Sequence, residues 1–109
     1  MFFWNRPKIE KLSAKELKTM LDNKEKFTLI DVRTPQEFAA GHLPKAKNIP
    51  LQTFESKLKS VVPELDEPVV LYCHSGSRSN TAARFMMSLG YTNVKTFPGI
   101  IQWSYDLKK

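Results

Sequence analysis

The sequence of 109 residues contains a single cysteine, so no disulfide can form within the chain. Beside it stand only two histidines, His42 and His74, too few for a convincing set of zinc ligands. The apolar residues Phe2, Phe3 and Trp4 form a stretch far too short for a signal-peptide core or a membrane span. We expect them to cover part of the domain surface or to stay loose. These shortages predict a reducing, cytoplasmic setting with no metal and no membrane span.

Long runs of like charge are also missing, although the chain is basic, with 17 Lys and Arg against 11 Asp and Glu and a formal net charge of +6. Such a surface attracts small anions. The lysines are scattered from Lys8 to Lys109 and accompany no nucleic-acid-binding motif, so nucleic acid is not predicted as a partner. The length and the 41% hydrophobic content are those of one soluble domain.

Residues 69–79 combine an apolar strand, a small polar loop and a helix start. The strand is long enough to be buried in a sheet and too short for an ordinary helix. Helical spacing resumes over residues 80–89. A loop between them can point its backbone N–H groups, and the positive end of the helix, at one anion. The predicted anion cradle consists of Cys73, His74, Ser75, Gly76, Ser77, Arg78 and Ser79.

Cys73 has two interpretations. A free cysteine is often a small buried hydrophobe, but such a residue has no need of Gly76, flanking serines and Arg78 nearby. These neighbours favour a thiolate nucleophile. One helix dipole contributes only about 0.3–1 kcal/mol, so the loop N–H groups and Arg78 are expected to share the lowering of the thiol pKa.

Strands and helices alternate along the rest of the chain. Strands are predicted over residues 9–12, 27–32 and 94–97, and an amphipathic helix over residues 54–61. Ser13 with Glu16, and Thr34 with Glu37, have the spacing of capping boxes that begin helices. A last amphipathic helix is predicted over residues 100–107. This alternation is typical of a three-layer α/β domain with ligands at the carboxyl ends of its strands.

Two opposite charges, Asp31 and Arg33, fall at such a strand end and need partners if they are buried. Glu37 is expected to neutralise Arg33, which leaves Asp31 free to reach elsewhere. In the irregular connection over residues 41–50, Ile49 is the expected core contact. We favour a loop histidine satisfied by the backbone as the interpretation of His42, over a role in proton transfer.

Four stretches together resemble the motifs of single-domain rhodaneses, a family of sulfurtransferase-type modules. They are residues 29–38, residues 41–50, the loop 73–79, and residues 99–103. The resemblance covers the chain from about residue 9 to its end, which makes residues 1–8 an N-terminal extension and residues 9–109 the rhodanese domain. It departs at Lys45 and Pro98, where the family commonly has glycine. It implies a three-layer rhodanese-like fold, a central parallel sheet of about five strands flanked by helices.

The resemblance also implies a sulfurtransferase that works through a persulfide on Cys73, without a cofactor. A small sulfur-containing anion such as thiosulfate would be the donor, and cyanide or a thiol the acceptor. The rest of the loop would hold the terminal sulfur, with His74 at the entrance and Arg78 shaping the loop. Asp31 would tether the loop or Arg78, and Arg33 and Glu37 would support the site.

The loop length distinguishes sulfur transfer from phosphoryl transfer within this resemblance. Four residues lie between Cys73 and Arg78, whereas cysteine phosphatases of a related fold have five, and the smaller cradle is associated with sulfur. Because no second cysteine exists, the acceptor must be an external thiol or thiol protein. The alternative is a non-catalytic or partner-dependent module that binds partners or carries sulfur.

Overall fold

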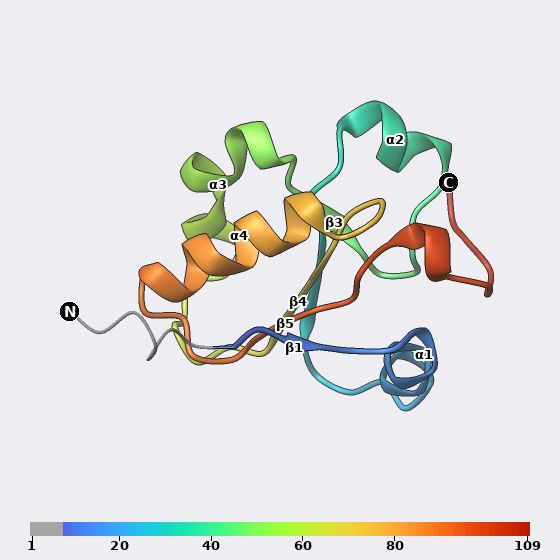
Figure 1. The fold of residues 1–109 in the computed structure, drawn as a ribbon, viewed down its shortest axis with the longest axis horizontal. Coiled ribbons are helices and arrows are strands. Elements are labelled where there is room, and N and C mark those ends of the chain that lie inside the picture. Colours follow the sequence, from blue (N-terminus) through green and yellow to red (C-terminus); the bar gives the residue numbers. More distant parts are fainter. Residues whose placement is uncertain (1–7) are drawn as a thin grey trace.

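The computed structural model describes residues 8–109, so the predicted roles of Phe2, Phe3 and Trp4 lie outside the described residues. A five-stranded sheet in the order β1-β5-β4-β2-β3 forms the centre, and all its strand pairs are parallel (Figure 1). The strands are β1 (Glu10–Lys11), β2 (Thr28–Asp31), β3 (Lys47–Asn48), β4 (Val69–Tyr72) and β5 (Val94–Thr96). The α-helices are α1 (Ala14–Asp22), α2 (Pro35–Ala40), α3 (Phe54–Val61) and α4 (Ser77–Ser88), and short 3-10 helices are η2 (Leu51–Thr53) and η3 (Ile100–Gln102).

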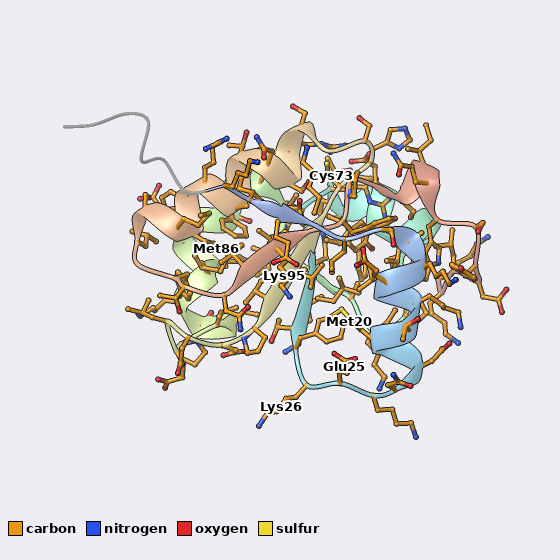
Figure 2. The ribbon with its side chains drawn as sticks, turned by 60° about the horizontal axis from the view of Figure 1, so that its bottom comes forward. Met20, Glu25, Lys26, Cys73, Met86 and Lys95 are labelled. Atoms are coloured by element: carbon orange, nitrogen blue, oxygen red, sulfur yellow. The ribbon has the colours of Figure 1, made fainter. Side chains whose placement is uncertain are left out.

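The sheet separates two apolar cores. Alternate residues of β4 point to opposite faces, with Leu71 in the core beneath α3 and α4, and Val70 in the core beneath α1 and the C-terminal segment. Figure 2 shows Met86 of α4 and Met20 of α1 on these two sides. The predicted three-layer α/β fold is therefore confirmed, and β4 is buried along its whole length.

Local sequence signals account for the helix starts. The hydroxyl of Ser13 accepts the backbone N–H of Glu16, whose carboxylate accepts the N–H of Ser13, so the capping box of α1 is complete. Thr34 and Glu37 form the same reciprocal pair at the start of α2, with proline at the first helical turn. Both predicted capping boxes are confirmed.

The parallel register brings the functional ends of the strands together. Asp31 at the end of β2 pairs in register with Tyr72 at the end of β4, so the residues that follow each strand emerge at the same edge of the sheet. Cys73 directly follows β4 at this edge. The sheet thus places the Cys73 loop beside the segment that leads from β2 into α2.

Two segments differ from the sequence-based prediction. The connection over residues 41–50 contains β3, the strand that completes the sheet, and Ile49 after it is buried as predicted. Helix α4 begins at Ser77 rather than at Asn80. Lys45, where the family commonly has glycine, has a φ of 68°, in the left-handed region that glycine adopts more readily.

The predicted helix over residues 100–107 was wrong. Only η3 forms, and the chain then turns back, because the indole N–H of Trp103 donates to the carbonyl of Asp106 at 3.2 Å. Lys108 exchanges two backbone hydrogen bonds with His42 beyond the turn. Trp103 is still buried against the sheet, but Leu107 is 45% exposed. Among residues 8–109, the helices are all too short or too polar to cross a membrane.

Candidate active site

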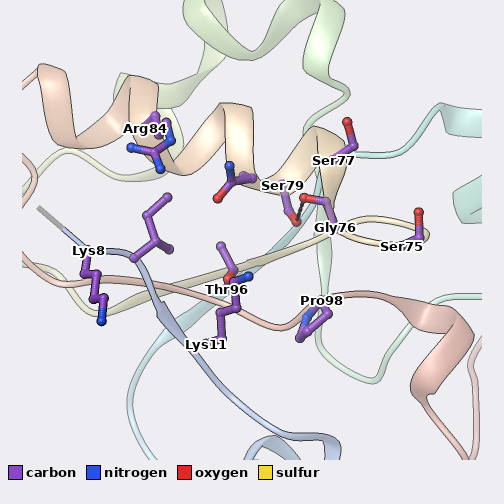
Figure 3. Close-up of a pocket in the computed structure, with 11 residues that line it drawn as sticks. Lys8, Lys11, Ser75, Gly76, Ser77, Ser79, Arg84, Thr96 and Pro98 are labelled. Atoms are coloured by element: carbon purple, nitrogen blue, oxygen red, sulfur yellow. Dashed lines mark hydrogen bonds between the residues drawn. The ribbon is translucent and has the colours of Figure 1, made fainter. Parts of the chain in front are cut away.

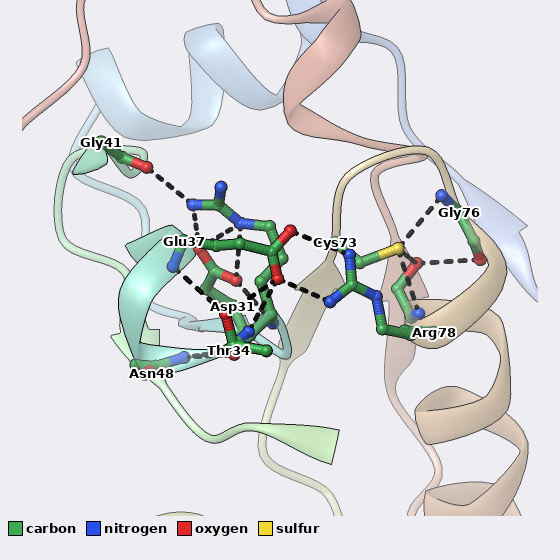
Figure 4. Close-up of polar contacts among 10 residues, drawn as sticks. Asp31, Thr34, Glu37, Gly41, Asn48, Cys73, Gly76 and Arg78 are labelled. Atoms are coloured by element: carbon green, nitrogen blue, oxygen red, sulfur yellow. Dashed lines mark hydrogen bonds and ion pairs between the residues drawn. The ribbon is translucent and has the colours of Figure 1, made fainter. Parts of the chain in front are cut away.

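The sulfur of Cys73 lies at the base of a loop whose backbone turns around it. The side chain is 1% exposed, and Sγ accepts backbone N–H groups from Gly76 at 3.1 Å and from Ser79 at 3.3 Å (Figure 4). The hydroxyl of Ser79 lies 3.5 Å from the same sulfur. This sulfur therefore meets a set of converging donors, which is the environment of an anion.

Gly76 allows the backbone to turn around the Cys73 sulfur. Its φ of 121° lies in a region that side chains disfavour, and α4 begins at the next residue. The early start of α4 brings the N–H of Ser79, one of the first-turn groups that lack a partner within the helix, toward the sulfur. The positive end of the helix dipole adds to the attraction for negative charge.

The donors favour the thiolate over the thiol. Burial raises the pKa of Cys73, but the hydroxyl and N–H of Ser79 and the N–H groups of Gly76 and Ser75 outweigh burial and lower the pKa overall. A thiolate held in this way is the nucleophilic form of cysteine.

Arg78 points its guanidinium at α2 rather than at the sulfur. Its Nη1 and Nη2 donate to Oε1 and Oε2 of Glu37 at 2.7 and 3.1 Å, a two-point pair between half-buried side chains. The hydrogen bonds from Arg78, with those from Thr34, lower the pKa of Glu37 to about 2. The pKa of Arg78 is raised, chiefly by Glu37 and in smaller part by the negative charge on Cys73.

The prediction that Glu37 neutralises Arg33 and leaves Asp31 free was wrong. The carboxylate of Asp31 accepts Nε of Arg33 at 3.0 Å and Nη2 at 2.7 Å, and both side chains are buried. Arg33 Nη2 also donates to the carbonyl of Gly41 at 2.7 Å. Residues two apart in an extended segment point to the same side, so the nearest carboxylate for Arg33 is Asp31. Asp31 therefore tethers the segment before α2 and not Arg78.

The turn after β5 supports the Cys73 loop from behind. Ile100 donates its N–H to the carbonyl of Cys73 at 2.9 Å, and Ile101 donates to the carbonyl of His74 at 3.2 Å. A side chain at Gly99 would collide with the backbone of His74 and Ser75. Periodicity did not reveal this support. The available signal was the glycine of the stretch 99–103, known only through the family resemblance.

The remaining predicted residues divide between the loop rim and the scaffold. His74, Ser75 and Ser77 are exposed on the rim of the loop. His42 stacks on Phe38 with ring centroids 3.8 Å apart, and its Nδ1 lies 3.0 Å from the carbonyl of Phe38. The interpretation of His42 as a backbone-satisfied loop histidine is therefore confirmed.

No cluster that would suit a metal ion is found in the described part of the chain. Groups of three or more His, Cys, Asp or Glu side chains at ligand distance are absent from residues 8–109. The chemistry that these residues offer is that of a thiolate in an anion cradle, held between α2 and the turn after β5.

The chain is similar to known proteins over most of its length. The family described as "Rhodanese-like domain" matches residues 13–103. A sulfurtransferase of Allochromatium vinosum is 35% identical over 97 residues, 88% of this chain and 89% of that protein. The putative sulfur carrier protein YrkF of Bacillus subtilis is 34% identical over 101 residues, 92% of this chain but 54% of that protein. The structure of the human single-domain sulfurtransferase TSTD1 is 30% identical with a TM-score of 0.78, covering 88% of this chain and 96% of that one.

Proposed function

Since the chain belongs to the rhodanese-like domain family, we propose that it transfers sulfur through a persulfide formed on Cys73. The observation that carries this proposal is the convergence of the N–H groups of Gly76 and Ser79 on the Cys73 sulfur. These donors stabilise negative charge on sulfur before the reaction, and they can do the same for the terminal sulfur of a persulfide.

The proposed reaction is a double displacement. The Cys73 thiolate attacks the outer sulfur of a donor such as thiosulfate, the bond between the two donor sulfurs breaks, and sulfite leaves with the bonding pair. The persulfide carries one negative charge, so charge and atoms balance. An acceptor nucleophile, cyanide or a thiolate, then attacks the terminal sulfur and restores the thiolate. The proposal needs no metal or cofactor, because the sulfur is carried covalently.

Arg78 and Glu37 have a positioning role in this proposal. The ion pair ties the first turn of α4 to α2, so it holds the N–H group of Ser79 in place beneath the sulfur. Asp31 and Arg33 act one step further away, by fixing the segment that leads into α2. His74, exposed at the entrance, is proposed to steer the incoming anion.

A partner-dependent sulfur carrier is the second candidate. The similarity to the putative sulfur carrier YrkF favours it. The single cysteine is common to both candidates, because in either case the persulfide passes its sulfur to an acceptor outside this chain. Both candidates require the same persulfide and differ in the donor. The single cysteine also supports our proposal of a reducing, cytoplasmic setting.

Intact mass spectrometry of the reduced protein tests the proposal. Thiosulfate should add one sulfur atom to the chain, and cyanide should remove it as thiocyanate. The variant Cys73→Ser should gain nothing. Absence of the gain with thiosulfate, but gain from a persulfidated protein donor, would favour the carrier. Absence of the gain with both donors, in a protein that remains folded, would contradict persulfide chemistry.

A further inference from the structure

An open cavity of about 780 Å³ lies beside the Cys73 loop, between β1, the end of β5 and the first turns of α4 (Figure 3). Loop residues line one end, and Lys8, Lys11 and Arg84 contribute basic side chains to the rest of the lining. Asp and Glu are absent from its described lining. Cys73 does not line it either, so the cavity neighbours the sulfur pocket without being part of it.

The three basic side chains of this cavity have no acidic partner in the described chain. The ion pairs among residues 8–109 use Lys18, Arg33, Arg78 and Lys95 as their cations. Residues 1–7 contain neither Asp nor Glu, so the sequence offers no carboxylate there. Three cations around one cavity repel one another, and an anionic ligand would relieve this repulsion.

The cavity is too large for the small anions of the sulfur reaction. Its volume is that of sites for ligands much larger than thiosulfate or cyanide, and the cations come from separate parts of the chain, Lys8 from before β1, Lys11 from β1 and Arg84 from α4. A compact anion would contact fewer of these cations than an extended ligand would. A ligand with several acidic groups along its length fits the arrangement better.

Strand β1 adds a feature that suits an extended chain. It is an edge strand of the sheet, paired only with β5 within the described residues, so part of its backbone faces outward without a strand partner. Peptides often bind along such edges, with side chains entering adjacent pockets. Lys11 belongs to this strand, and Lys8 comes shortly before it.

We propose that this cavity binds an acidic peptide segment of the protein that exchanges sulfur with Cys73. This inference rests on the proposed function, because it assigns the docking surface of the sulfur partner. Ser75, Gly76 and Ser77 belong to the Cys73 loop and also line the cavity, so a segment bound in the cavity lies against the loop. A thiolate near that segment attacks the terminal sulfur, the S–S bond to Cys73 breaks, and its bonding pair returns to Cys73. The transferred sulfur keeps the negative charge that it carried in the persulfide, so charge and atoms balance.

Peptide binding tests the site without requiring sulfur chemistry. The probe is a fluorescein-labelled peptide of alternating Glu and Gly, compared by anisotropy with a matched peptide of Gln and Gly. At low salt the acidic peptide should bind about tenfold more tightly, and salt at about 0.3 M should remove most of the difference. The triple variant Lys8→Gln, Lys11→Gln, Arg84→Gln should lose the preference. The variant Lys8→Arg, Lys11→Arg, Arg84→Lys should keep it.

A matched control separates the site from net charge. The triple variant Lys15→Gln, Lys57→Gln, Lys109→Gln removes the same charge from residues outside the cavity lining, and it should bind the acidic peptide as the wild type does. Equal losses in the two triple variants, or no loss in the cavity variant, would overturn the proposal. Competition by free glutamate at equal carboxylate concentration would also overturn it, because it would indicate a site for small anions.

The same peptides with a terminal cysteine then serve as acceptors for the persulfide. The acidic thiol should discharge the wild-type protein about tenfold faster than the neutral thiol, and the cavity variant should show no preference. A persulfide that discharges equally to both peptides would refute the docking site and leave the proposed function intact. Peptide binding in a protein that never gains sulfur would refute the proposed function instead.

Discussion

Glu37 and Arg78 lie 41 positions apart in the sequence, yet they form a two-point ion pair across the edge of the sheet. The same carboxylate also accepts the N–H and hydroxyl of Thr34 in the capping box of α2. One side chain thus completes a helix start and anchors the arginine of the Cys73 loop. The position of the loop therefore depends on α2 being formed.

This ion pair predicts a stability change in acid. The folded-state pKa of Glu37, about 2, is below its ordinary value of 4.5, so its contribution is complete above pH 4.5 and is lost as the pH falls through about 2. The pair is about one third exposed, which limits the contribution to about 1 kcal/mol. Urea unfolding between pH about 5 and about 2 should show a smaller loss in Glu37→Gln than in the wild type.

Glu55→Gln is the matched control, since Glu55 is exposed and forms no ion pair within the described residues. Its acid profile should follow that of the wild type. An identical profile for Glu37→Gln would show that the pair contributes nothing to folding.

Ser79 predicts a shift in cysteine reactivity. The pKa of Cys73 is lowered because the donors of the loop, with Ser79 first among them, outweigh burial. Alkylation by iodoacetamide requires the thiolate, so its midpoint should lie at lower pH than for an unstructured cysteine peptide. Ser79→Ala should move the midpoint to higher pH and slow alkylation near neutral pH by roughly tenfold. Ser77→Ala removes an exposed hydroxyl of the same loop and should change neither the midpoint nor the rate of alkylation. Equal effects in the two variants would argue against a specific hydrogen bond from Ser79.

The close contact of Gly99 with the Cys73 loop predicts that no side chain is tolerated at position 99. A Cβ at this position would overlap the backbone of His74 and Ser75, so Gly99→Ala must displace the loop or the turn after β5. We expect the free energy of unfolding to fall by about 1–3 kcal/mol, with slower alkylation of Cys73. Ile101→Ala, at a side chain that is 65% exposed, should cost less than about 0.5 kcal/mol. Wild-type behaviour of Gly99→Ala would mean that the close approach is not needed.

The buried pair of Asp31 and Arg33 predicts a large loss of stability. Asp31→Asn leaves the charge of Arg33 buried without a counter-charge, which costs about 3–5 kcal/mol in such pairs. The exposed pair of Lys18 and Asp22 provides the comparison, and Asp22→Asn should change stability by about 0.5 kcal/mol or less. Chemical denaturation followed by circular dichroism measures both. Similar losses in the two variants would contradict the assignment of Asp31 as a structural anchor.

The sequence by itself determined the features that depend on neighbouring residues. The capping boxes of Ser13 and Thr34, the buried strand before Cys73 and the anion cradle after it follow from local hydrogen bonding and from periodicity. The family resemblance added the five-stranded sheet, because the two-residue strand β3 is too short to leave a periodic signal of its own.

Tertiary structure alone decided which charges pair and which path the C-terminal segment takes. The spacing of Glu37 and Arg33 in the sequence is compatible with an ion pair between them. In the structure, α2 directs Glu37 toward Arg78, and Arg33 pairs with Asp31 instead. The helical spacing of residues 100–107 was overridden by the contact of Trp103 with Asp106 and by the pairing of Lys108 with His42. Partners far apart in sequence are chosen by the packing of whole elements, and no local pattern encodes that choice.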